Sequence, residues 1–97
     1  MKVNFTVKAK ALNGEPLRER GEELWLNKTL AGVIMMQEAR DNTTMQKFEL
    51  ATKLYNAQGE IEITESEKAI IKEVCEKGSM LIIIAAQILN IVNNPTA

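Results

Sequence analysis

Polar and apolar residues alternate along the first part of the chain. In residues 2–12 every second position is apolar, which leaves one apolar and one polar side. The apolar positions are Val3, Phe5, Val7, Ala9 and Ala11. A period of two with one apolar side predicts a half-buried β-strand. Asn13-Gly14 predicts a tight turn after it, and Pro16 prevents regular pairing at its own position.

Residues 17–26 follow a weaker pattern. The segment carries a charged patch around Gly21 and ends in the apolar run Leu24-Trp25-Leu26. We interpret it as a second short strand with an irregular tip.

Helical spacing begins after this segment. Asn27 is predicted to cap a helix, because its side-chain oxygen can accept hydrogen bonds from the free amides of the first turn. The apolar residues of this helix are Leu30, Val33, Ile34, Met35 and Met36. A second helix is expected to begin at Thr43 or Thr44 and to close at Gly59. Its apolar side carries Met45, Phe48, Ala51 and Tyr55, with Leu50 and Leu54 adjoining.

A strand and a well-marked helix come next. Residues 60–63 alternate again and predict a short strand. Thr64 and Glu67 have the spacing of a capping box, in which each side chain binds the other residue's backbone amide at the start of a helix. We expect this helix to end at Gly78. Its predicted buried residues are Ile70, Ile71, Val74 and Cys75.

The last helix is predicted to begin after a cap at Ser79. From Met80 to Val92 it is interrupted only by Gln87 and Asn90, so we expect it to be buried on most sides. It is shorter than the ~20 residues that a membrane span needs. The tail at 94–97 is expected to be frayed.

These elements predict one α+β domain over residues 1–93. Their order is strand, strand, helix, helix, strand, helix, helix. We expect a small, mostly antiparallel sheet of two or three strands with four helices packed on one face. A chain of 97 residues has room for a single core.

Composition excludes several classes of function. The chain has no histidine and one cysteine, which removes the usual zinc sites and every nucleophile that depends on histidine. The formal net charge of −1 lacks the strongly basic field of most DNA-binding domains. We therefore predict that the protein is not an enzyme, with no catalytic, cofactor-binding or metal-binding residues.

The carboxylates Glu60 and Glu62 are the candidates for acid–base chemistry. They lie two residues apart on one side of a strand, and paired carboxylates can exchange protons with a substrate. An electrostatic role is favoured, because Lys2, Lys8 and Lys10 line the polar side of the first strand. If the two strands are neighbours, opposite charges meet across them.

Three other kinds of residue have alternative interpretations. Cys75 is interpreted as a core thiol, since Glu73 and Glu76 do not favour a thiolate. Trp25 is either buried with its ring nitrogen bonded or an anchor for a partner. Met35, Met36 and Met80 are either core-filling residues or part of an adaptable binding surface.

Several segments resemble a group of small proteins encoded in bacteriophage and prophage genomes. They are "LNKTLAGVI", "LATKLYNAQGEIEITESEKAIIKEVCEKG" and the final "LIIIAAQILNIV", which contains Gln87. The resemblance implies an origin in a phage or prophage and a place in the bacterial cytoplasm. It assigns no activity and no functional residue.

We expect a non-catalytic protein that acts through protein–protein contacts, in assembly or in host regulation. The alternative is a nucleic-acid accessory protein that uses Lys2, Lys8, Lys10, Lys28 and Lys47. Self-association is a further hypothesis, because the last helix is too apolar for a small domain to cover easily. We expect no membrane partner.

Overall fold

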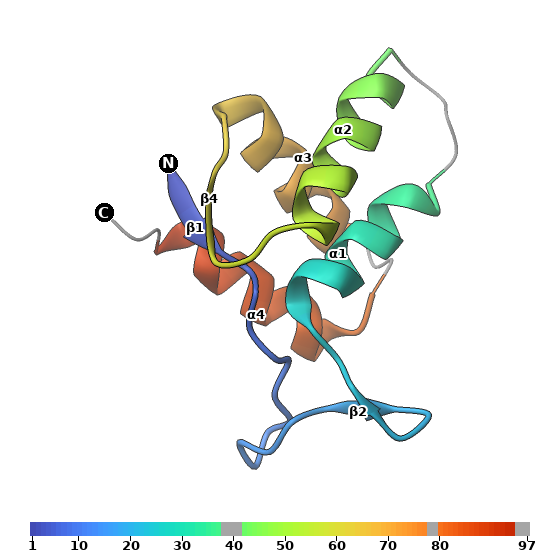
Figure 1. The fold of residues 1–97 in the computed structure, drawn as a ribbon, viewed down its shortest axis with the longest axis vertical. Helices are drawn as coiled ribbons and strands as arrows, with labels where there is room; N and C mark the ends of the chain where they lie inside the picture. The colour runs from blue at the N-terminus through green and yellow to red at the C-terminus, as the bar shows by residue number, and fades with distance from the viewer. Residues whose placement is uncertain (38–41, 78–79, 95–97) are drawn as a thin grey trace.

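The computed structural model describes residues 1–37, 42–77 and 80–94. In these residues the chain forms four helices and two small antiparallel sheets, which confirms the predicted α+β class (Figure 1). In chain order the elements are β1 (Lys2–Asn4), β2 (Arg18–Glu19), β3 (Glu22–Glu23), α1 (Leu26–Met35), α2 (Thr44–Tyr55), β4 (Glu60–Glu62), α3 (Glu65–Glu76) and α4 (Ile82–Asn93).

The first sheet joins the start of the chain to the segment between α2 and α3. β1 pairs antiparallel with β4, and Lys2 lies opposite Glu62 in the register. The predicted proximity of these strands is therefore confirmed. Regular pairing stops at Asn4 rather than running to residue 12, because the Asn4 side-chain oxygen accepts a hydrogen bond from the Thr6 amide and turns the chain. Beyond it, only isolated bridges at Lys8 and Lys10 continue the predicted strand.

The second sheet is a separate hairpin. Residues 17–26 were predicted as one strand, but they form β2 and β3 around a tight turn at Arg20 and Gly21. Both turn residues have positive φ angles, of 54° and 84°, as a two-residue hairpin turn requires. The strands are thus divided between two sheets. The hairpin projects from the helical body of the molecule (Figure 1).

Helices α1 and α2 form an antiparallel pair that buries one side of each. The buried residues are Leu26, Asn27, Leu30, Ala31 and Ile34 of α1, and Leu50, Ala51 and Leu54 of α2. The prediction of Asn27 as a cap is wrong, because α1 already begins at Leu26 and Trp25 occupies the cap position. The Asn27 side chain instead points inward, and its Nδ2 donates to the Leu54 carbonyl at 3.0 Å.

A polar joint links α2, β4 and α3. The predicted capping box is present: Thr64 Oγ1 accepts from the Glu67 amide at 3.1 Å, and the Glu67 carboxylate accepts from the Thr64 amide at 2.9 Å. Lys53 of α2 binds the same carboxylate at 2.9 Å and the Glu62 carbonyl at 2.8 Å. Gly59 lies before β4 with a φ of 109°.

Helix α4 packs mainly against α3 and β1. Its buried residues are Ile84, Ala85, Ile88 and Val92. The prediction of burial on most sides is wrong at the start of the helix, where Ile82 is 87% exposed and the preceding Leu81 is 65% exposed. Among the described helices none has the length and apolarity to cross a membrane.

Some predictions fall outside the described residues. The helix end at Gly78 and the cap at Ser79 are among them. Of the predicted tail at 94–97, only Asn94 is described, and its side chain donates to the Asn90 carbonyl at 2.9 Å.

Candidate functional site

Large apolar side chains are exposed in two places on the described part of the chain. The first place is formed by the end of α1, with Met35 and Met36, and by α2, with Met45, Phe48 and Tyr55. We call these five residues the methionine–aromatic face. Near the start of α4 they are Leu12, Leu81 and Ile82. Among the described residues, Val7 is the one other exposed large apolar side chain. The grouping indicates surfaces for contact rather than scattered single residues.

The methionines on this face correct the core-filling interpretation. Met35 is 53% exposed and Met36 is 86% exposed, because the buried stripe of α1 follows Leu30 and Ile34 and turns these residues outward. Met80 is half-buried and packs against the core, as core filling predicts. The alternative interpretation, an adaptable surface, is therefore the one that fits Met35 and Met36.

A hollow of about 270 Å³ lies on the outer side of the α1–α2 pair, between the two helices. The space exists because the residues that face it, such as Gly32 on α1 and Ala51 on α2, have small side chains. A Cβ atom added to Gly32 would meet no atom within 4 Å. Larger side chains from the methionine–aromatic face stand beside them. The lining residues are Lys28, Ala31, Gly32, Met35, Ala51, Thr52, Tyr55 and Asn56.

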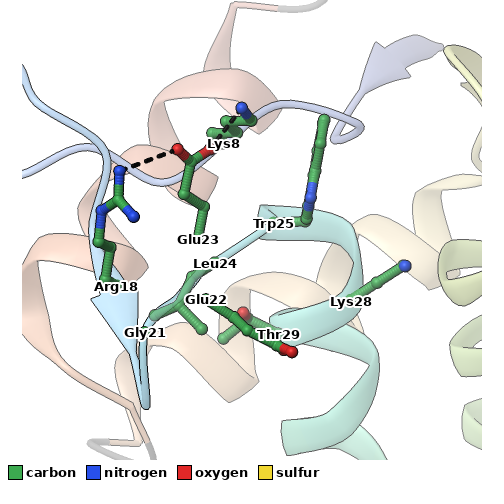
Figure 2. Close-up of a pocket in the computed structure, with 9 residues that line it drawn as sticks. All are labelled: Lys8, Arg18, Gly21, Glu22, Glu23, Leu24, Trp25, Lys28 and Thr29. Carbon is green, nitrogen blue, oxygen red and sulfur yellow. Dashed lines mark hydrogen bonds and ion pairs between the residues drawn. The ribbon is translucent and has the colours of Figure 1, made fainter.

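A second hollow, of about 700 Å³, lies between the hairpin and the start of α1 (Figure 2). Glu23 sits between two cations there, in an ion pair with Lys8 and at 3.4 Å from Arg18 Nη2. The hydrogen bond from Lys8, supported by the charges of Lys8 and Arg18, holds the pKa of Glu23 below its ordinary value. Glu23 therefore stays ionised and fixes the hairpin against the first segment of the chain.

The two hollows meet at Lys28. A third hollow, of about 380 Å³, lies between Trp25 and Tyr55, and Lys28 lines all three. The Lys28 ammonium lies 5.6 Å from the centre of the Tyr55 ring, and the Lys8 ammonium lies 5.6 Å from the centre of the Trp25 ring. We call this combined surface the α1 groove.

Trp25 is half-buried in the wall of the groove. The interpretation as a buried indole is therefore wrong, because the residue stands where the chain leaves the hairpin and lines the groove, with the Lys8 ammonium over its ring. The remaining interpretation, an anchor for a partner, is consistent with this position.

Lys28 is the cation of the groove that has no counter-ion. Within residues 1–37, 42–77 and 80–94, no carboxylate forms an ion pair with its ammonium group. Figure 2 shows its side chain extending away from the hairpin, whereas Lys8 and Arg18 are turned toward Glu23. The groove therefore offers one free positive charge between two aromatic rings.

The carboxylates singled out in the sequence lie apart from the groove. Glu60 and Glu62 are exposed on β4, and the Glu62 carboxylate lies 3.4 Å from the ammonium group of Met1. Their place supports the electrostatic interpretation. Across the described chain no group of three or more Cys, Asp or Glu side chains is arranged to hold a metal ion.

Cys75 is buried in α3, as predicted for a core thiol. Burial, with a smaller effect from the charge of Glu76, raises the pKa of its thiol to about 11. The thiol form therefore persists at neutral pH, and the residue has no nucleophilic character.

The lysines proposed for nucleic-acid binding do not form one free cationic stripe. Lys8 is paired with Glu23, and Lys2 lies opposite Glu62. Lys10 lies beside α4, where its backbone binds Gln87. Lys8 and Lys28 both line the groove, but Lys8 is paired there with Glu23, and Lys47 lies on α2.

Sequence reasoning missed the outward position of Met45, Phe48 and Tyr55. These residues recur at helical spacing, and the sequence placed them on the same apolar side of the helix as Ala51, with Leu50 and Leu54 adjoining. A signal was present, since Leu50, Ala51 and Leu54 form a second apolar stripe on the same helix, and one helix of a small domain rarely buries both. The two stripes together indicate one buried and one contact side.

The chain matches no protein-family model, no curated protein and no solved structure. Its function is therefore inferred from the geometry of the surfaces described above.

Proposed function

We propose that this chain is a non-catalytic interaction protein that binds a segment of a partner protein in the α1 groove. The observation that carries this proposal is the cluster of exposed Met35 and Tyr55 and half-buried Trp25 around Lys28, which has no counter-ion among the described residues. Interface cores are enriched in aromatic residues and methionine, and burial of such groups provides most of the binding energy.

The charge of the groove indicates the kind of partner. Lys8, Arg18 and Lys28 face it together with Glu22 and Glu23, so its lining carries a net charge of +1. An apolar segment with an acidic residue fits this lining, because its side chains can fill the space at Gly32 while its carboxylate pairs with Lys28. Methionine side chains at the edge adjust to differently shaped partners.

The biological setting follows from the sequence resemblance. Its likeness to small bacteriophage and prophage proteins supports a role in phage assembly or in regulation of the host, within the bacterial cytoplasm. An interaction protein without catalytic groups suits either role.

The first test is selection from a random peptide library displayed against the purified chain. We expect enriched peptides that combine large apolar residues with Asp or Glu. Trp25 is the only tryptophan of the chain, so its fluorescence reports binding of a synthetic peptide directly. Lys28→Glu should weaken binding about tenfold or more, which corresponds to at least 1.4 kcal/mol.

Two further variants make the test specific. Gly32→Leu fills the groove without a clash at the Cβ position, and it removes a helix-destabilising glycine, so it should block binding while the fold is kept. Lys72→Glu changes the same charge on α3 and should leave affinity unchanged. Peptides that bind both groove variants as well as the wild type, or an absence of enrichment, would contradict the proposal.

The alternative function, that of a nucleic-acid accessory protein, can be tested with the same Trp25 fluorescence assay. Salt-dependent quenching of Trp25 by single-stranded DNA, without any response to acidic peptides, would replace the proposal with the nucleic-acid function.

A further inference from the structure

A second contact surface lies at the start of α4, away from the α1 groove. Leu12 is 99% exposed, Ile82 is 87% exposed and Leu81 is 65% exposed, and Ala86 is exposed one turn after Ile82. We call these four residues the α4 patch. Leu12, Ile82 and Ala86 line one hollow of about 760 Å³, which shows that the turn and the helix form a single surface.

Leu12 is held in place by the polar residue inside the apolar helix. Gln87 Oε1 accepts from the Lys10 amide at 2.9 Å, and Gln87 Nε2 donates to the Lys10 carbonyl at 2.7 Å. The turn that follows is closed by hydrogen bonds from Ala11 to Glu15 and from Gly14 to Ala11. An exposed leucine on a fixed turn loses little conformational freedom on binding, which favours it as an anchor.

The α4 patch differs from the α1 groove in its charge. Residues 80–94 contain no Asp, Glu, Lys or Arg, and Lys10 is the single charged residue that lines the hollow. A two-fold contact places each surface against its own copy, so it requires a surface that does not repel itself. The four residues of the α4 patch carry no charge and therefore meet this condition.

The α4 patch also carries both parts of a self-complementary contact. Leu12 and Ile82 project from it, and the same two residues line the hollow of about 760 Å³. In a two-fold contact each projection of one copy meets the matching hollow of the other, so a surface that carries both can pack against itself.

We propose that two copies of this chain associate through the α4 patch around a two-fold axis. Ile82 and Leu12 of each copy fill the hollow beside α4 of the other. Ala86 lies between Ile82 and Asn90 on the same side of the helix, and its small side chain allows the two helices to approach closely. This inference does not depend on the partner proposed for the α1 groove.

The test is the molar mass in solution, measured by sedimentation equilibrium from low to high micromolar concentration. We expect the mass of the wild type to rise toward twice 10.9 kDa. Ile82→Glu and Leu12→Glu should each raise the dissociation constant about tenfold or more, since they place like charges in an apolar contact. A carboxylate in the first turn of α4 is favoured by the helix dipole, so Ile82→Glu should keep the fold.

The matched control is Met36→Glu, because Met36 is 86% exposed on the methionine–aromatic face, away from the α4 patch. It should leave the dissociation constant unchanged. As a second measurement, oxidised Ala86→Cys should form a disulfide-linked dimer, whereas Thr52→Cys in the groove should not. A monomer mass at every concentration, or equal weakening by Met36→Glu, would overturn the proposal.

Discussion

At the scale of single residues, Asn27 is the unusual member of the core. It is 2% exposed, and within the described chain its Oδ1 is the one buried side-chain polar atom without a hydrogen-bond partner. Its Nδ2 supports the end of α2 by binding the Leu54 carbonyl, which also accepts from the Ala57 amide at 3.2 Å. The amide thus ties α1 to the end of α2, and Asn27 lines the same hollow of the α1 groove as Tyr55.

Charge at this position should be poorly tolerated. Asn27→Asp replaces the donating Nδ2 with a second oxygen, so a buried carboxylate would face the Leu54 carbonyl without a donor. We expect it to lower the free energy of unfolding by about 1–3 kcal/mol more than Asn27→Ala, which removes the unpaired oxygen as well. Urea denaturation followed by circular dichroism measures both values.

Two features make the comparison decisive. The difference between the variants should shrink at acidic pH, because protonation restores a donor to the carboxyl group. Gln58→Ala, at an exposed position beyond α2, should have little effect. Equal stability of the aspartate and alanine variants at neutral pH would refute this account of the site.

At the scale of elements, the joint of Lys53, Thr64 and Glu67 fixes α3 against α2 and β4. Partial burial opposes ionisation of Glu67, but the hydrogen bonds from Lys53 and Thr64 together outweigh it and hold the pKa of this carboxyl below its ordinary value of 4.5. Because the pKa is lower in the folded state, the ionised carboxylate stabilises the fold above pH 4.5. This contribution is lost as the pH falls through the lower, folded-state pKa.

Glu67→Gln should remove the charge and keep the capping box, since the amide oxygen can still accept from the Thr64 amide. We expect a loss of about 0.5–1 kcal/mol at neutral pH that disappears in acid. Thermal unfolding across a pH series measures it. Glu65→Gln changes another carboxylate in the same first turn, and it should show only the smaller effect of the helix dipole. An equal loss in both variants would assign no role to Lys53.

At the scale of the whole molecule, the two contact surfaces are borne by different elements. The α1 groove belongs to the hairpin, α1 and α2, whereas the α4 patch belongs to the turn after Lys10 and to α4. Their charges also differ, with free Lys28 in one and an uncharged helix in the other. A dimer formed through α4 can therefore present two grooves, and linked grooves raise the apparent affinity for a partner with repeated segments.

The two surfaces should be independent in solution. Ile82→Glu is expected to keep the peptide affinity of the groove within about twofold, and Lys28→Glu should keep the dimer dissociation constant within the same range, because distant sites without shared contacts are additive. Titration of Trp25 fluorescence and sedimentation equilibrium measure the two quantities. Loss of peptide binding in the Ile82 variant would show that the groove requires the second copy.

Local sequence by itself determined much of this protein. Alternation at Val3 and Ile61 indicated two strands, and the opposite charges of Lys2 and Glu62 indicated that these strands pair. The Thr64 and Glu67 spacing specified a helix start, and the apolar stripe through Ile70 and Cys75 specified a buried side. These features depend on residues within a few positions of one another, or on the fixed periods of strands and helices.

Only the tertiary structure decided which apolar residues were left outside. Met36, Tyr55 and Ile82 are large side chains within the same apolar stretches as Ile34, Leu54 and Ile84, so the pattern could not show which of them would be buried. Their exposure depends on how many helix sides a core of this size can cover, and on where the hairpin and the turn at Leu12 lie. Burial is a property of packed neighbours from distant parts of the chain, and no local period contains it.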